Sequence, residues 1–266
     1  MRGDATSNPW RSRRVIGFAH QGGALEGPAG TIEAMLLARR SGASALEFDV
    51  HRSSDECLVV HHDPVVVGAG GESLRMKTSR LDDLRRLRPD LATMDEVLAA
   101  FPGVPMTVEV KARGAAEPAA RMLAEEEGER AVVVTAFSPS TVKAVKRAAP
   151  EVHTAPGWPA ILAFWLVSRA FGLALPLRGH VALQVALDIS GVAFVKKVPL
   201  LRRLRIADRW LVRAAHRRGL AVHVWTLNDE RSMHAALDAG ADGIFTDRPS
   251  VLTKVLDARG VRWRDG

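Results

Sequence analysis

The sequence predicts an α/β protein built as a single (β/α)8 TIM barrel, and three observations support this prediction. The chain has 266 residues, of which 47% are hydrophobic, and barrels of this kind commonly occupy such a length as one domain. Short apolar runs alternate with helix-like segments along most of the chain, which is typical of a parallel sheet, closed or open. No repeat of fixed period is visible, and this excludes a solenoid.

Each apolar run bounded by turn-forming residues predicts a strand, and the segments between the runs predict helices. Ser138 before Pro139 marks one helix start, Asn228 or Asp229 marks another, and Gly240 marks the end of that helix. The glycine-rich stretch 67–79 is expected to be a loop. The expected strands are 15–20, 45–50, 106–111, 131–136, a short one near His153, 182–185, 221–226 and 243–246. The expected helices are 31–41, 94–101, 116–127, 139–148, 161–171, 206–217, 229–239 and 249–258.

The chain is expected to divide into three segments. Residues 1–14 are polar and arginine-rich, which predicts a flexible basic segment without the apolar core of a signal peptide. Residues 15–259 form the expected barrel, and residues 260–266 form a C-terminal tail. The single cysteine, Cys57, cannot form an internal disulfide, so we expect a cytoplasmic protein, with or without peripheral attachment to the inner membrane face.

Charged side chains gather at the carboxyl ends of the first three predicted strands. His20 ends the first strand, Glu47 and Asp49 lie two apart in the second, and Glu109 and Lys111 lie two apart in the third. Side chains two apart in a strand share a face. We therefore expect the two pairs to point into the barrel, where the carboxyl ends of the strands carry the catalytic groups of this fold.

The three carboxylates predict a metal site. Each carboxylate buried inside a barrel lowers the stability of the fold by roughly several kcal/mol unless a cation neutralises its charge. Oxygen donors without cysteine suit one divalent cation, Mg²⁺ or Ca²⁺, better than Zn²⁺. Buried ion pairs with arginine are the alternative, but three such groups beside two histidines favour the metal.

Six short motifs contain these residues and resemble the glycerophosphodiester phosphodiesterase family. Family members carry His-Arg-Gly, Pro-Glu-Asn-Thr, Glu-x-Asp-Val, Val-Val-x-His-Asp, Glu-x-Lys and Trp-Thr-x-Asn in this order. The order and spacing match from Val15 to about Leu252. The corresponding stretches are Ala-His-Gln-Gly at 19–22, Pro-Ala-Gly-Thr at 28–31, Glu-Phe-Asp-Val at 47–50, Val-Val-His-His-Asp at 59–63, Glu-Val-Lys at 109–111 and Trp-Thr-Leu-Asn at 225–228.

The resemblance implies the roles of the charged groups. It implies a divalent ion on the three carboxylates, an acid and base pair of His20 and His62, and phosphate binding by Lys111. His61 precedes His62, but strand alternation turns one of them away, and only His62 matches the family histidine. The implied reaction is metal-dependent hydrolysis of a glycerophosphodiester or a lysophospholipid to glycerol phosphate and an alcohol. In the family's proposed mechanism, the glycerol 2-hydroxyl attacks first to give a cyclic phosphate, which water then opens.

Two departures from the family pattern leave the substrate open. Gln21 replaces an arginine, so a bidentate phosphate contact becomes at most a neutral hydrogen bond, and residues 29–30 lack the glutamate and asparagine. Trp225 is expected to form a wall of the substrate pocket, although an aromatic residue in a strand is more often part of the core. The alternatives are a sphingomyelinase D-like lipid phosphodiesterase and a non-catalytic phosphate-binding barrel.

The formal net charge of +7 indicates attraction to anionic partners. No nucleic-acid motif is visible and aromatic residues are not interleaved with the basic ones, so no nucleic-acid partner is expected. The segment 158–177 is strongly apolar and fits an ordinary core-packing helix first. Together with the basic residues up to 205, it also fits a peripheral contact with an anionic membrane through residues 158–205.

Overall fold

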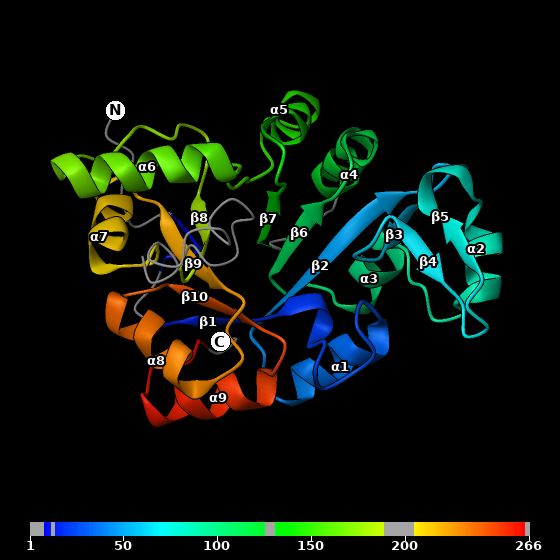
Figure 1. Cartoon of the computed structure of the whole chain (residues 1–266), viewed down its shortest axis with the longest axis horizontal. Coiled ribbons are helices and arrows are strands. Elements are labelled where there is room, and N and C mark those ends of the chain that lie inside the picture. Colours follow the sequence, from blue (N-terminus) through cyan, green and yellow to red (C-terminus); the bar gives the residue numbers. More distant parts are fainter. Residues whose placement is uncertain (1–7, 12–13, 126–130, 189–204, 264–266) are drawn as a thin grey trace.

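The computed structural model describes residues 8–11, 14–125, 131–188 and 205–263, and it forms a (β/α)8 barrel (Figure 1). Neighbouring barrel strands are parallel, and their order in the sheet is β7-β6-β2-β1-β10-β9-β8. The predicted fold class is therefore confirmed. These strands are β1 (Ile16–Ala19), β2 (Ala45–Arg52), β6 (Met106–Val110), β7 (Val132–Thr135), β8 (Ala182–Ala186), β9 (Ala221–Trp225) and β10 (Gly243–Thr246).

Thr154 closes the barrel at the place of the short strand expected near His153. It forms isolated parallel bridges with Val134 on one side and His180 on the other. Pro150 and Pro156 flank this stretch, and proline supplies no N–H group to a strand ladder. The eighth position of the barrel is consequently one bridged residue rather than a full strand.

The helices alternate with the strands as the sequence predicts. Thr31, Asp208 and Asp229 accept hydrogen bonds from backbone N–H groups at the starts of three helices, so Asp229 rather than Asn228 is the N-cap. No helix within the described ranges is both long and apolar enough to cross a membrane. The helices are α1 (Ile32–Arg40), α2 (Leu81–Leu87), α3 (Met94–Ala100), α4 (Arg113–Glu125), α5 (Pro139–Ala148), α6 (Trp158–Phe171), α7 (Arg209–Arg217), α8 (Glu230–Ala239) and α9 (Pro249–Ala258).

The stretch 67–79, expected to be a loop, contains regular structure. β4 (Val65–Val67) and β5 (Ser73–Arg75) form an antiparallel hairpin outside the barrel sheet, followed by the short helix η2 (Met76–Thr78). β3 (Leu58–Val60) pairs antiparallel with the last three residues of β2. This subdomain protrudes at the right of Figure 1, away from α6 and α7. The loop prediction missed it because its apolar residues form a small separate core of Val59, Val66, Met76, Leu84 and Leu91.

Both ends of the described chain pack against the amino-terminal end of the barrel. Trp10 is 1% exposed and stacks on Phe18, with ring centroids 5.9 Å apart. Asn8 donates hydrogen bonds to the carbonyls of Val181 and Gly219. The N–H of Trp263 donates to the carbonyl of Val15, so this residue also lies against the barrel. The division of the chain at residues 15 and 259 stays a prediction, and Asn8, Trp10 and Trp263, which lie outside these boundaries, contact the barrel.

Candidate active site

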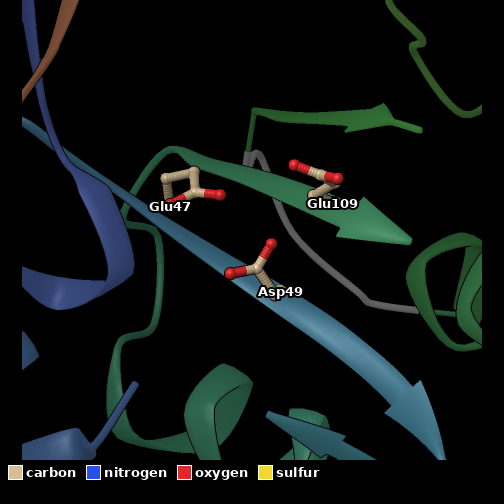
Figure 2. A group of neighbouring side chains, drawn as sticks. All are labelled: Glu47, Asp49 and Glu109. Carbon is tan, nitrogen blue, oxygen red and sulfur yellow. The ribbon is translucent and has the colours of Figure 1, made fainter. Parts of the chain in front are cut away.

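Glu47, Asp49 and Glu109 converge inside the barrel, as their strand positions predict. β2 and β6 are adjacent, and Asp49 lies directly opposite Glu109 in the ladder. Phe48 and Val50 are fully buried in the layer between sheet and helices, so the alternate residues point inward. One carboxylate oxygen from each of the three acids lies within 4.8 Å of the others (Figure 2).

Lys111 contacts two of these carboxylates. Its Nζ atom lies 3.2 Å from Oδ1 of Asp49 and 3.1 Å from Oε1 of Glu109. Burial opposes the charged form of Lys111, but the two carboxylates outweigh it and raise the pKa of the ammonium group. Burial and the charge of Asp49 raise the pKa of Glu109. Burial and the charges of Asp49 and Glu109 raise the pKa of Glu47. Three carboxylates against the ammonium group of Lys111 and the imidazole of His20 leave this cluster short of positive charge.

The donor set fits a hard divalent cation. All three groups offer oxygen, and Oδ2 of Asp49 is buried without a hydrogen-bond partner among the described residues. Buried ion pairs with arginine were the alternative to a metal. Among the described residues, the carboxylates pair with Lys111 and His20 instead. An unpartnered buried carboxylate oxygen is costly unless a cation or proton satisfies it.

His20 enters the site from η1 (His20–Gly22), directly after β1. Its Nδ1 atom lies 2.7 Å from Oδ1 of Asp247, and its Nε2 atom lies 3.9 Å from Oε2 of Glu47. A carboxylate only accepts hydrogen bonds, so Nδ1 carries a proton. Burial lowers the pKa of His20, but the charges of Glu47 and Asp247 outweigh it and raise the pKa to about 9.

Asp247 is a partner of His20 that sequence reasoning did not assign to the site. Asn228 Nδ2 donates to Oδ2 of Asp247 at 2.6 Å, and the N–H of Asp247 donates to Oδ1 of Asn228 at 2.8 Å. Burial raises the pKa of Asp247, but hydrogen bonds from His20 and Asn228 lower it below its usual value. Asp247 follows β10 directly, and this carboxyl-end position was the signal that could have identified it.

His62 lines the same cavity as His20 and the three acids. Its Nδ1 atom lies 2.9 Å from Oδ1 of Asp63, and its carbonyl accepts a hydrogen bond from Nε2 of His51 at 3.1 Å. His61 instead lines an adjoining cavity and binds the carbonyl of Asp63. Both candidate histidines, His20 and His62, therefore bind an aspartate through Nδ1 and leave Nε2 for other contacts. This contact of His51 fixes the backbone at His62.

Gln21 lies beside the main cavity rather than in its lining. Its φ of 49° is left-handed, which is uncommon for a residue other than glycine, and its N–H donates to Oε2 of Glu47 at 2.8 Å. The residue lines the adjoining cavity of about 210 Å³, together with His62 and Arg88. The backbone of Gln21 thus holds a carboxylate of the acidic cluster whatever its side chain does.

The main cavity encloses about 280 Å³ and has a polar and an apolar side. The carboxylates, the two histidines and Lys111 form the polar side. Trp225 lines the cavity at the end of β9. Sequence reasoning missed its aromatic neighbours Phe137 and Trp158, which also follow the carboxyl ends of barrel segments.

Residues 20–251 match the model of the glycerophosphoryl diester phosphodiesterase family. With the fold and the site, this match defines a phosphoric diester hydrolase on a TIM barrel. It excludes the alternative of a non-catalytic phosphate-binding barrel. The chain belongs to the glycerophosphoryl diester phosphodiesterase family.

Known proteins resemble the chain over nearly its full length. It is 30% identical over 256 residues to "Probable glycerophosphodiester phosphodiesterase 2" of Mycobacterium tuberculosis, covering 92% of both chains. It is 24% identical to "Lysophospholipase D GDPD3" of Homo sapiens, covering 91% of this chain and 85% of that one. A solved phosphodiesterase of Oleispira antarctica in complex with the product sn-glycerol-3-phosphate superposes with a TM-score of 0.66 at 18% identity, covering 92% of this chain and 97% of that chain.

Proposed function

We propose that the protein hydrolyses glycerophosphodiesters to glycerol phosphate and an alcohol in a reaction that depends on a divalent cation. The observation that carries this proposal is the convergence of Glu47, Asp49 and Glu109 in one cavity with His20 and His62. The names of the relatives, which include both glycerophosphodiester phosphodiesterases and lysophospholipase D, support the same reaction class.

The three carboxylates would hold one cation, Mg²⁺ or Ca²⁺, because their oxygen donors suit a hard ion. When bound, the cation neutralises charge on the non-bridging phosphate oxygens and makes phosphorus more electrophilic. Lys111 contacts Asp49 and Glu109 from the same cavity, so its ammonium group would bind a second phosphate oxygen beside them. The N–H of Gln21 keeps Glu47 oriented toward this position.

The two histidines would move the protons. One takes the proton of the attacking hydroxyl, from water or from the glycerol 2-hydroxyl, as the new P–O bond forms. The other gives a proton to the alcohol oxygen as the old P–O bond breaks. Each histidine is held at Nδ1 by an aspartate, Asp247 for His20 and Asp63 for His62, so Nε2 is the atom that exchanges protons with the substrate.

Gln21 and Trp225 are the proposed substrate contacts outside the charged cluster. The side chain of Gln21 would reach substrate from the adjoining cavity, as a neutral hydrogen-bond partner. Trp225 would bind the part of the substrate that faces away from the carboxylates. A lysophospholipid is the second candidate substrate, because an apolar wall faces the phosphate position and a curated relative is named for that activity.

A peripheral contact with an anionic membrane is proposed for segment 158–205, of which residues 189–204 lie outside the described structure. The described part of α6 buries Phe164 and Trp165 and exposes Leu166 and Phe171, with Arg169 between the two exposed residues. Cosedimentation with anionic and neutral vesicles tests this contact. The proposed cytoplasmic location rests on the single Cys57, which forms no disulfide.

Chelation with metal replacement tests the proposed function. Protein treated with EDTA should not hydrolyse glycerophosphocholine, and added Mg²⁺ or Ca²⁺ should restore release of choline and glycerol 3-phosphate in equal amounts. A parallel panel with lysophosphatidylcholine and sphingomyelin separates the glycerophosphodiester reaction from a sphingomyelinase D-like one. Hydrolysis that persists undiminished after complete chelation would show that the carboxylate cluster has another role.

A further inference from the structure

The departures of this chain from the family motifs gather at one cavity. Gln21, Ala29 and Gly30 stand where family members carry arginine, glutamate and asparagine, and all three line the adjoining cavity of about 210 Å³. Asp49 and His62 line both this cavity and the main one, so the two cavities meet beside the acidic cluster. The departures therefore change one place next to the proposed phosphate position.

The small residues leave this cavity open. A Cβ atom added to Gly30 would meet only the carbonyl oxygen of Val60 within 4 Å, at 3.9 Å. Ala29 ends at its own Cβ, and the side chain of Gln21 is shorter than that of an arginine and carries no charge. The cavity thus offers room and lacks the positive charge that an arginine at position 21 would supply.

Arg88 lines the same cavity from a different part of the chain, and it is the only arginine among the described residues that line either cavity. It follows α2 directly, its N–H donates to the carbonyl of Leu84, and its carbonyl accepts a hydrogen bond from the N–H of Leu91. Both leucines are buried in the small core of the subdomain. These contacts fix the backbone from which the Arg88 side chain extends.

Asp90 orients the guanidinium of Arg88. Nε of Arg88 lies 3.1 Å from Oδ1 of Asp90, and Nη2 lies 2.9 Å from Oδ2. A bidentate pair of this kind fixes the plane of the guanidinium, and Nη1 takes no part in it. Asp90 is not part of the described cavity lining, so the positive charge borders the cavity and its counter-ion does not.

We propose that Arg88 is a substrate-binding residue that gives the diester phosphate the guanidinium contact that position 21 no longer provides. The inference rests on the proposed function, because hydrolysis at the acidic cluster is what places the phosphate beside this cavity. A guanidinium suits the role because its N–H groups match phosphate oxygens and its charge does not titrate in the physiological range. The rival role is a purely structural ion pair with Asp90, which predicts a loss of stability without a loss of phosphate binding.

Binding of sn-glycerol 3-phosphate measures the proposed contact without turnover. Isothermal titration of wild type and Arg88→Ala, at the same Mg²⁺ concentration, should show an affinity that is lower in the variant by roughly 10- to 100-fold, as expected for a lost charged hydrogen bond. Equal affinities would overturn the inference. Arg88→Gln keeps most of the apolar stem, carries the same expectation and replaces Arg88→Ala if that variant does not fold.

Arg86→Ala is the matched control for these titrations. Arg86 belongs to the same helix, is 75% exposed in an ion pair with Asp83, and does not line either cavity. Its removal changes the net charge by the same amount as Arg88→Ala. It should bind sn-glycerol 3-phosphate as wild type does, and a loss equal to that of Arg88→Ala would reduce the effect to overall charge and overturn the inference.

Gln21→Arg tests whether positions 21 and 88 serve one contact. A guanidinium at position 21 should replace much of what Arg88→Ala loses. The gain in kcat/KM for glycerophosphocholine from Gln21→Arg should therefore be several-fold larger in the Arg88→Ala background than in wild type. An equal gain in the two backgrounds would show that the positions act independently and would overturn the inference.

The outcomes separate this inference from the proposed function. Weaker binding of sn-glycerol 3-phosphate by Arg88→Ala, without hydrolysis of any glycerophosphodiester by wild type, would support the contact and count against the proposed function. Hydrolysis by wild type, with binding and turnover unchanged in Arg88→Ala, would overturn the contact and leave the proposed function standing. A lower free energy of unfolding with unchanged affinity would assign Arg88 to its ion pair with Asp90 and overturn the inference.

Discussion

The Nδ1 atom of His20 lies 2.7 Å from Oδ1 of Asp247, whose other oxygen accepts a hydrogen bond from Asn228. This chain of contacts joins three barrel segments, β1, β9 and β10, at their carboxyl ends. It fixes both the orientation of the imidazole and the nitrogen that carries its proton. Asp247 is therefore the residue on which the geometry of His20 depends most directly.

Asp247→Asn should lower kcat for glycerophosphocholine by roughly 10- to 100-fold. A positioned acid or base raises the rate by roughly 10²–10⁴, and the variant should lose part of this contribution. An amide can present its oxygen to Nδ1 but carries no charge, so KM should change little and the pH dependence of kcat should move. Asp238→Asn, in an exposed ion pair with Arg259, is the control and should behave as wild type. A uniform loss of folded protein in place of a kcat effect would assign Asp247 to stability alone.

His62→Ala should reduce turnover by roughly two to four orders of magnitude, because the variant lacks one of the two proposed proton carriers. His61→Ala should have little effect, since His61 lines the adjoining cavity rather than the main one. Steady-state kinetics of the two variants with the same substrate provide the comparison. A larger loss at His61 than at His62 would reverse the assignment.

Gln21→Arg should raise kcat for glycerophosphocholine by roughly tenfold or more. A charged hydrogen bond contributes about 1.5 to 3 kcal/mol, and a guanidinium beside the phosphate would share its charge with Lys111. The N–H contact to Glu47 comes from the backbone and is kept in the variant. If the variant folds and binds metal but loses activity, the glutamine contacts a different part of the substrate, and the proposed phosphate role of this position is wrong.

His223 predicts an acid-sensitive stability. It is fully buried among Trp10, Phe18 and Phe245, and burial lowers its pKa to about 4. Between pH 6.5 and 4 the unfolded chain takes up a proton that the folded protein does not, so the free energy of unfolding falls by up to about 3 kcal/mol. The other histidines change the free energy of unfolding equally in wild type and in a variant without His223. Their contributions therefore cancel when the two proteins are compared.

Urea unfolding at pH 7 and pH 4.5 measures this effect. The stability lost between the two pH values should be smaller in His223→Leu than in wild type. Equal losses in the two proteins would show that His223 accepts a proton in the folded state.

The barrel was predictable because alternation of apolar runs and helices is a local property of the sequence. Glu47 and Asp49 could be assigned to one face for the same reason, since side chains two apart in a strand share a face. The contact between His20 and Asp247 joins residues 227 positions apart, and no local pattern specifies it. The burial of Trp10 under the barrel floor and the hairpin of β4 and β5 were missed because tertiary packing, rather than periodicity, determines them.

The central claim is that Glu47, Asp49 and Glu109 hold a divalent cation on which hydrolysis depends, and Glu47→Gln tests it most directly. The amide oxygen of the variant can still accept the N–H of Gln21, so the fold should persist, but the charge of one proposed ligand is lost. The measurement is the rate of glycerophosphocholine hydrolysis by EDTA-treated protein as Mg²⁺ or Ca²⁺ is added, with Glu56→Gln, at an exposed ion pair with Arg52, as control. We expect wild type and Glu56→Gln to recover full activity while Glu47→Gln stays below roughly 1% of it. Turnover of Glu47→Gln equal to wild type at the same metal concentration would contradict the account.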